Sequence, residues 1–262
     1  MSSRKEQKEA ARAERQAKEQ EHAASAARQK RMRMLAVVVG IAAVVVAVLV
    51  VVNLGGTGGG GEVKGSSEVQ TRLDGIPQKN MALGKEDAPL TMVEFADPQC
   101  PYCAQYNNDV LPDLIDKYVK TGQMRMELRL QTFVDNSTGD ADSTETASMA
   151  VALGEQSFAW NFMDLFYINQ GDEAADTVND SSLLDLAGAI PGADGKKALA
   201  ARDSETVKTE LAASEQLFNA KTGGGTPSFL IGNTGGELKS LPVQQLELSE
   251  FTATIDELLA AQ

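Results

Sequence analysis

The chain has 262 residues, a formal net charge of −13, 42% hydrophobic residues and 23% charged residues. This composition is typical of a folded protein and argues against wholesale disorder. The acidic balance disfavours a nucleic-acid partner, because phosphate binding needs a basic surface. The sequence has one histidine, His22, and two cysteines, Cys100 and Cys103. These counts argue against a Ser-His-Asp hydrolase, a histidine-rich metal site and a multi-disulfide scaffold.

The N-terminal region has the pattern of a membrane anchor. Residues 1–33 contain ten Lys or Arg and five Asp or Glu, and residues 34–52 contain no charged or amide side chain. A helix of these 19 residues would be roughly 28 Å long, close to the ~30 Å hydrocarbon core of a bilayer. Because the basic residues precede it, we expect a cytoplasmic tail over 1–33, a transmembrane anchor over 34–53 and an extracytoplasmic remainder. The protein would then be a single-pass protein of the cell membrane.

A cleaved signal peptide is the alternative interpretation of this apolar run. Signal peptides normally have an apolar region of about 7–15 residues that ends at a small-x-small cleavage site. Here the run is longer, the charged leader before it is 33 residues long, and no convincing cleavage site follows. We therefore favour an uncleaved anchor.

Glycine dominates the next stretch, with six of the seven residues from Gly55 to Gly61. Such a segment does not offset the entropy of ordering it and behaves as flexible coil. We expect a flexible linker over 54–78 with an r.m.s. reach of about 25–30 Å. The folded domain should then occupy 79–262, which is long enough for one substantial hydrophobic core.

The two cysteines lie between an expected strand and an expected helix. Residues 90–95 are mostly apolar and lead into Cys100-Pro101-Tyr102-Cys103. Proline suits the first position of a helix, where its missing N–H is not needed, and Pro112 should kink or restart that helix. Residues 123–130 alternate apolar and polar side chains, as in a strand with one buried face. The predicted order is strand, Cys-x-x-Cys at a helix start, helix, strand.

This position gives the cysteine pair its expected chemistry. A thiol at a helix N-terminus faces unpaired backbone N–H groups and the positive end of the helix dipole, which favour the thiolate. Cys100 comes first, on an exposed turn, and should be the nucleophile. Cys103 lies one turn further in and suits a shielded resolving thiol. The pair is close enough to form a redox-active Cys100–Cys103 disulfide, which a stable thiolate would make more oxidising.

Other readings of the cysteines are less consistent with the sequence. A zinc site needs about four ligands, and the expected domain has no third cysteine and no histidine. A structural disulfide with this spacing would close too short a loop to constrain much chain. Two inert buried thiols remain as a further alternative. We therefore favour a redox-active pair and expect neither a metal nor another cofactor.

A second motif lies far downstream, where a glycine-rich loop leads through Thr226-Pro227 into a short apolar run ending at Asn233. Proline is tolerated at the first residue of a strand, so this motif alone predicts a loop-to-strand junction with a trans proline. Together with Glu94-Phe95-x-Asp97-x-x-Cys100-Pro101-Tyr102-Cys103, it closely resembles the DsbA-like branch of the thioredoxin superfamily. The resemblance covers about residues 79–262 and includes the lead-in Asn80–Pro89.

The resemblance implies an α/β thioredoxin-like fold with a helical insertion over about 138–221. The insertion is expected to cap the active-site side and to contain several amphipathic helices. One carries Phe158, Phe162, Leu165 and Phe166, another Leu183, Leu184 and Leu186, and a third Val207, Leu211 and Phe218. A hairpin at Gly235-Gly236 and a final helix from about Ser249 complete the expected domain.

The resemblance also assigns supporting roles in the site. Pro227 should be cis and pack against the disulfide, while the backbone of Thr226 pairs with a substrate chain. Glu94 matches a buried acid thought to shuttle protons near the cysteines, although an acid that reaches solvent is the alternative. Tyr102 should tune the thiolate and contact substrate; strongly oxidising members usually have histidine there. Trp160 suits the core of the insertion better than a peptide groove.

The implied protein is a membrane-tethered thiol-disulfide oxidoreductase whose substrates are secreted or envelope proteins with cysteines. We expect an oxidase that forms disulfides and is reoxidised by a membrane partner of the DsbB or VKOR type. A reductase or isomerase with the same residues is one alternative, since Tyr102 leaves the direction of electron flow open. A chaperone-like peptide-binding module with a structural disulfide is the other.

Overall fold

The computed structural model describes residues 63–171, 177–222 and 224–262. The predicted cytoplasmic tail and the predicted anchor over 34–53 lie outside these residues. Within the described ranges, no helix has both the length and the apolar character needed to cross a bilayer.

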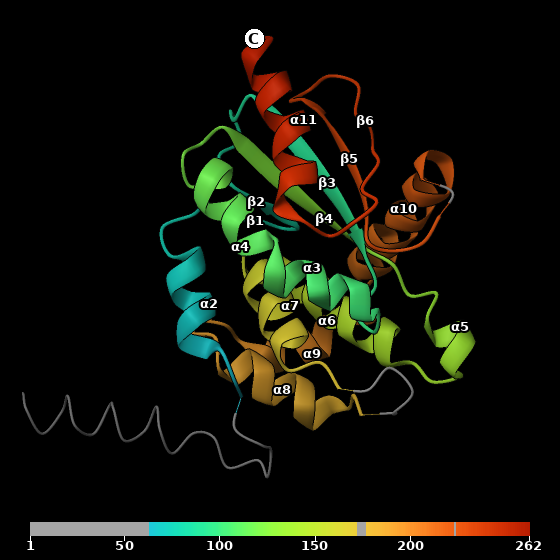
Figure 1. Ribbon diagram of the computed structural model, residues 1–262. Coiled ribbons are helices and arrows are strands. Elements are labelled where there is room, and N and C mark those ends of the chain that lie inside the picture. The colour runs from blue at the N-terminus through green and yellow to red at the C-terminus, as the bar shows by residue number, and fades with distance from the viewer. Residues whose placement is uncertain (1–62, 172–176, 223) are drawn as a thin grey trace, which may run out of the picture. The chain divides into compact units, whose positions relative to one another are not determined.

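A mixed β-sheet forms the centre of the domain (Figure 1). Across the described residues its strand order is β1-β2-β4-β3-β5-β6. β3 and β4 run parallel, with Leu90 opposite Met124, and the other neighbours are antiparallel. Every residue of β3 is buried, whereas β4 alternates between buried and half-buried positions, as its sequence predicts. The strands are β1 Gln78–Lys79, β2 Ala82–Leu83, β3 Leu90–Ala96, β4 Met124–Leu130, β5 Ser228–Asn233 and β6 Lys239–Leu241.

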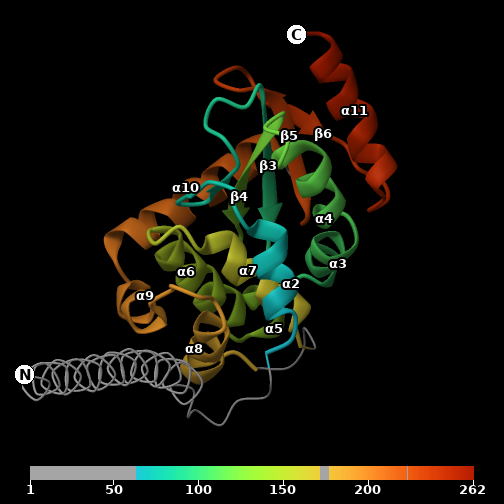
Figure 2. The ribbon, with the colours of Figure 1, turned by 90° about the vertical axis from the view of Figure 1, so that its left-hand side faces the viewer.

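Helices cover both faces of this sheet (Figure 2). On one face, Phe251 of the C-terminal helix packs edge-on against Phe229 of β5, with 4.9 Å between ring centroids. On the other face, Phe218 packs against Phe95 of β3 at 5.5 Å. The first face carries α3 Pro101–Asp109, α4 Leu111–Leu114, the π-helical turn η1 Ile115–Val119 and α11 Leu248–Ala260, and the second carries α10 Glu205–Lys221.

The interruption between α3 and α4 has the predicted cause. α3 ends at Asp109, α4 begins at Leu111, and Pro112 lies in its first turn. A proline there has no N–H to bond to the preceding turn and its ring crowds the carbonyl four residues back, so the helix restarts. Before β4 the backbone turns at Gly122, whose φ is 76°, a conformation that favours glycine.

The helical insertion lies beyond the carboxyl ends of β3 and β4 (Figures 1 and 2). Trp160 is buried in it and donates from its indole nitrogen to the carbonyl oxygen of Met81 over 3.0 Å, which confirms its core position. α10 packs both on α6 of the insertion and on strand β4 of the sheet, and its Phe218 lies against Phe95 of β3. The insertion helices are α5 Asp135–Thr138, α6 Asp142–Gly154, α7 Ala159–Ile168, α8 Asp180–Gly188 and α9 Gly195–Ala201.

The structure also differs from the expected linker. Residues 66–73 fall inside the predicted linker over 54–78, yet Ser66–Leu73 forms helix α2. Val69 and Leu73 are buried in the core, and the Ser66 hydroxyl donates to the carbonyl oxygen of Ala189 over 2.8 Å. Two apolar residues four positions apart are too weak a periodic signal to predict a packed helix. The folded part therefore begins well before residue 79.

Candidate active site

The two sequence motifs meet at the carboxyl end of β3. The chain leaves β3 at Ala96, and Cys100 caps helix α3, whose first residue is Pro101 as predicted. β5 pairs with β3 in antiparallel fashion, and this register brings the loop before Ser228 to the same edge. The Thr226-Pro227 peptide bond in that loop is cis, as the family resemblance implies. The Cys100 thiol donates to the carbonyl oxygen of Thr226 over 3.3 Å.

Cys100 is set up to ionise. The pKa of Cys100 is lowered to about 6, chiefly by a hydrogen bond from the Cys103 thiol. Burial acts in the opposite direction and raises the pKa. The Thr226 hydroxyl and the backbone N–H groups of Cys103 and Tyr102 lower it further. At neutral pH the reduced protein therefore holds Cys100 mainly as a thiolate. Both cysteines are free thiols in the structure.

Cys100 is less exposed than the sequence suggests. Its exposed fraction is 7%, whereas the neighbouring Tyr102 is 63% exposed. The expectation of an exposed turn was therefore wrong for Cys100 itself, whose sulfur lies against the carbonyl oxygen of Thr226. The next two residues, Pro101 and Tyr102, are exposed.

Cys103 has the opposite environment. It is completely buried, and burial, followed by the adjacent Cys100 sulfur, raises the pKa of Cys103 well above its usual range. One helical turn thus separates a thiol that ionises readily from one that holds its proton. A lowered pKa is what a nucleophilic thiol needs, and the roles of nucleophile and resolving thiol remain predictions.

Glu94 is a buried acid, so the solvent-reaching alternative was wrong. Its exposed fraction is 2%. Burial, followed by the charge of Asp164, raises the pKa of Glu94 to about 8. Its neighbour Tyr106 has a buried hydroxyl without a hydrogen-bond partner in the described part of the chain. A carboxyl that is protonated near neutral pH suits proton exchange with a buried thiol.

Asp97 is a site residue for which we predicted no role beyond its place in the family motif. Its carboxyl is buried and accepts from the backbone N–H groups of Gln99 and Val134, both over 3.1 Å. The Ser143 hydroxyl at the start of α6 lies 2.5 Å from the same carboxyl. Burial raises the pKa of Asp97 to about 6, and the Ser143 hydrogen bond opposes this. The position of Asp97, an acid between a buried strand and the Cys-x-x-Cys motif, could have indicated a site residue. Its partners could not be predicted, because Val134 and Ser143 are remote in sequence.

Comparisons with known proteins agree with this geometry. A family model described as Thioredoxin matches residues 77–257, more than half of the chain. The chain belongs to the thioredoxin family.

Relatives of this thioredoxin-family protein include disulfide bond formation protein D of Bacillus subtilis, which is 30% identical over 105 residues. That match covers 40% of this chain and 46% of the relative, so it spans about half the length of the relative. Among solved structures, BdbD from Bacillus subtilis has a TM-score of 0.59 at 22% identity, over 69% of this chain and 93% of that one. Wolbachia pipientis alpha-DsbA1 has a TM-score of 0.56 at 20% identity, over 72% and 93%. These two structures share the fold.

In this thioredoxin-family domain the helical insertion holds the cysteine loop through its backbone. The Tyr167 hydroxyl donates to the carbonyl oxygen of Asp97 over 3.2 Å. The Gln170 amide donates to the carbonyl oxygens of Pro98, over 2.6 Å, and Cys100, over 3.3 Å. These contacts fix the entry to α3, so the insertion is part of the site's support. No local sequence pattern indicates that Tyr167 or Gln170 contacts the cysteine loop. Within the described residues no group of three or more His, Cys, Asp or Glu could hold a metal ion.

Proposed function

We propose that this protein is an extracytoplasmic thiol-disulfide oxidoreductase that forms disulfides in secreted or envelope proteins. The observation that carries the proposal is the asymmetry of the pair: the pKa of Cys100 is lowered to about 6, and that of buried Cys103 is raised. A stable Cys100 thiolate favours the reduced enzyme, which makes its disulfide an oxidant. The thiol-disulfide chemistry of the Bacillus relative, indicated by its name, supports the same reaction class.

The reaction begins with the Cys100–Cys103 disulfide. A client thiolate attacks the Cys100 sulfur, the disulfide bond breaks, and Cys103 leaves with the electron pair. Because Cys103 is buried, it takes up a proton, which the Glu94 carboxyl is suited to supply. A second client thiolate then attacks the client sulfur of the mixed disulfide, and Cys100 leaves as a thiolate. The client gains a disulfide and loses two electrons to the enzyme.

The cis Pro227 loop supports client binding in this scheme. Thr226 lies beside the Cys100 sulfur, two residues before β5 begins at Ser228, where an extended client segment would pair with its backbone. Exposed Tyr102 would contact the same segment. We propose that a single anchor over 34–53 holds the enzyme at the cell membrane, and that a membrane partner of the DsbB or VKOR type reoxidises it.

A trapping experiment tests the exchange chemistry. In the Cys103→Ser variant the mixed disulfide at Cys100 has no internal thiol to resolve it, so client proteins should accumulate on the full chain and be released by a reductant. Cys100→Ser is the matched control and should trap none. Absence of trapped protein in Cys103→Ser would favour the chaperone-like module.

The direction of electron flow needs a separate measurement. Tyr102 stands where strongly oxidising relatives of the DsbA type usually have histidine, and this favours a reductase or isomerase as the second candidate. Equilibration with glutathione buffers gives the reduction potential of the Cys100–Cys103 pair. We expect a potential more oxidising than that of the glutathione buffer; a strongly reducing value would remove the oxidase proposal and leave the second candidate.

A further inference from the structure

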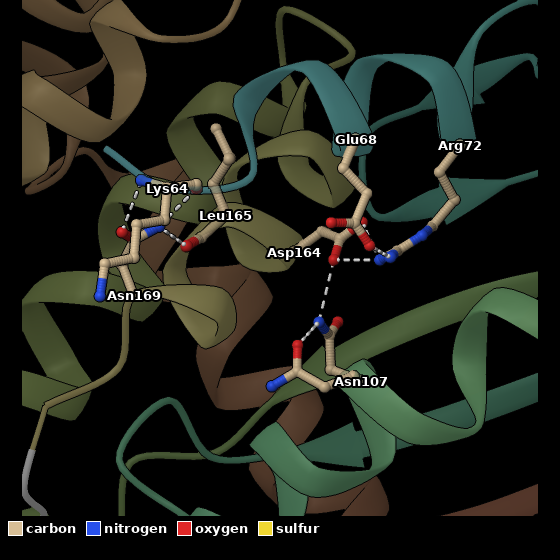
Figure 3. Close-up of polar contacts among 8 residues, drawn as sticks. Lys64, Glu68, Arg72, Asn107, Asp164, Leu165 and Asn169 are labelled. Atoms are coloured by element: carbon tan, nitrogen blue, oxygen red, sulfur yellow. Dashed lines mark hydrogen bonds and ion pairs between the residues drawn. The ribbon is translucent and has the colours of Figure 1, made fainter. Parts of the chain in front are cut away.

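Helix α2 makes a buried ion pair with the helical insertion (Figure 3). The Arg72 guanidinium donates to both carboxylate oxygens of Asp164, over 2.6 and 2.8 Å. The two side chains are only 9% and 3% exposed. α2 lies before residue 77, where the match to the family begins. A segment outside the matched region therefore contributes a charge to the domain interior.

The same carboxylate contacts the cysteine helix. Asn107 of α3 donates to Asp164 over 2.9 Å, and its side chain points at the carboxylate beside Arg72 (Figure 3). Asn107 is four residues after Cys103, so the two share one face of α3. Asp164 therefore lies between α2 and the helix that carries both cysteines.

The charge of Asp164 is one cause of the raised pKa of Glu94. Among the described residues, Tyr106 of α3 and Tyr167 of α7 also interact electrostatically with Glu94. Burial raises the pKa of both tyrosines well above the usual range, so both stay neutral near pH 8.

We propose that α2 is a working part of the active site, in which Arg72 keeps Asp164 ionised so that Asp164 controls proton exchange between Glu94 and Cys103. Arg72 and Asp164 are positioning residues, since neither touches the reacting sulfurs. The inference rests on the proposed function, because it assigns Glu94 as the proton partner of Cys103.

The charges indicate the direction of the effect. Burial raises the pKa of Asp164 even though Arg72 opposes this, so without Arg72 the carboxyl should take up a proton. An ionised Asp164 makes a second negative charge on Glu94 more costly. Loss of either member of the pair should therefore make Glu94 release its proton at lower pH.

The pH dependence of a two-step exchange reports this effect. The reduced full chain reacts with dithiobis-nitrobenzoate: the Cys100 thiolate attacks the reagent and releases one thionitrobenzoate. Cys103 then passes its proton to Glu94, attacks the Cys100 sulfur and releases the second. The first phase should follow the ionisation of Cys100, and the second should rise through the ionisation of Glu94, near pH 8.

Asp164→Asn removes the charge but keeps an acceptor for Arg72 and Asn107. We expect its second-phase inflection to move down by about one pH unit, with the first phase unchanged. Arg72→Met should shift it in the same direction. If Asp164→Asn does not fold, the paired Arg72→Gln/Asp164→Asn variant removes both charges and leaves none unpaired in the interior. The same downward shift is expected there.

Glu68→Gln is the matched control. Glu68 also pairs with Arg72, over 2.7 Å, but its side chain is exposed, so its loss should leave the inflection in place. An equal shift in Glu68→Gln would contradict a specific role for Asp164, and an upward shift in Arg72→Met would contradict the role of Arg72. An unmoved inflection in Asp164→Asn, with the wild-type inflection present, would overturn the inference. If Glu94→Gln keeps the wild-type inflection, the proposed role of Glu94 fails instead.

Discussion

The Cys100 sulfur lies 3.3 Å from the carbonyl oxygen of Thr226, a residue 126 positions away in sequence. As a thiol, Cys100 donates its hydrogen to this carbonyl. A thiolate has no hydrogen to donate, so ionisation leaves the sulfur in need of another donor. The Thr226 hydroxyl is buried without a hydrogen-bond partner among the described residues. This one residue thus offers an acceptor to the thiol and a donor to the thiolate.

Thr226→Val should weaken the Cys100 thiolate. The Thr226 hydroxyl contributes to the lowered pKa of Cys100, and a hydrogen bond to a charged group is worth about 1.5–3 kcal/mol. We expect the pKa of Cys100 to rise by about 1 unit, measured by thiolate ultraviolet absorbance across a pH titration. Thr226→Ser keeps the hydroxyl and should titrate like the wild type. An unchanged pKa in Thr226→Val would show that the hydroxyl does not stabilise the thiolate.

The reduced protein should gain stability over the oxidised protein as pH rises. The pKa of Cys100 is lowered to about 6 in the folded state from an ordinary value of 9.0. Its contribution is therefore fully present above pH 9 and is lost as pH falls through 6. The oxidised form has no thiol to ionise, so the difference in unfolding free energy should grow by up to about 4 kcal/mol over this window. Denaturant titrations of both forms measure it.

Cys100→Ser provides the control for this stability difference. Serine does not ionise in this range, so the pH-dependent gain assigned to Cys100 should disappear in the variant. A gain of equal size in Cys100→Ser would assign the effect to other groups.

Asp97 should make the folded state less stable as pH rises from about 4 to 6. Its pKa is raised from 3.8 to about 6, so the folded state binds the proton more tightly than the unfolded state. The resulting stability is present below pH 3.8 and is lost through pH 6, a change of about 3 kcal/mol. Asp97→Asn does not titrate and should remove this part of the slope, measured by thermal unfolding at a series of pH values.

The network around Asp97 gives an independent reason for this prediction. The Ser143 hydroxyl has one hydrogen but lies 2.5 Å from an Asp97 oxygen and 2.8 Å from the Gln99 side-chain oxygen. The Gln99 amide nitrogen faces the carboxylate of Asp140, which fixes its orientation. While Asp97 is ionised, Ser143 donates to it and leaves the Gln99 oxygen without that hydrogen. Once Asp97 is protonated, its O–H can donate to the Ser143 oxygen, and Ser143 can donate to Gln99. A wild-type slope retained in Asp97→Asn would contradict this assignment.

Leu73→Ala should destabilise the whole domain, because α2 is packed into its core. Leu73 is buried, and truncation of a buried leucine costs about 2–5 kcal/mol. Gln70→Ala alters an exposed residue of the same helix and should change stability by less than about 0.5 kcal/mol. Denaturant unfolding of both variants measures the difference. Equal stabilities would show that α2 behaves as linker, as composition alone suggested.

The elements around the cysteines were predictable because their signals are local. Strand β3, the proline at the first position of α3, the restart at Pro112 and the alternating strand β4 all follow from residues within a few positions of one another. We did not predict α6 from the sequence. Buried residues lie on almost every face of this helix, so it has no amphipathic pattern to recognise. Helix α2 was hidden for the opposite reason, having too few apolar residues.

The sequence by itself was enough to predict that Cys100, rather than Cys103, is the nucleophile, because a helix start and a two-residue spacing are properties of a short stretch of chain. Only the tertiary structure decided what surrounds that sulfur. Thr226 reaches Cys100 through the register of β5 on β3, Ser143 reaches Asp97 from the insertion, and Arg72 reaches Asp164 from α2. Desolvation and charge act through space at a few ångströms. The difference in pKa between Cys100 and Cys103 therefore depends on neighbours that are remote along the chain.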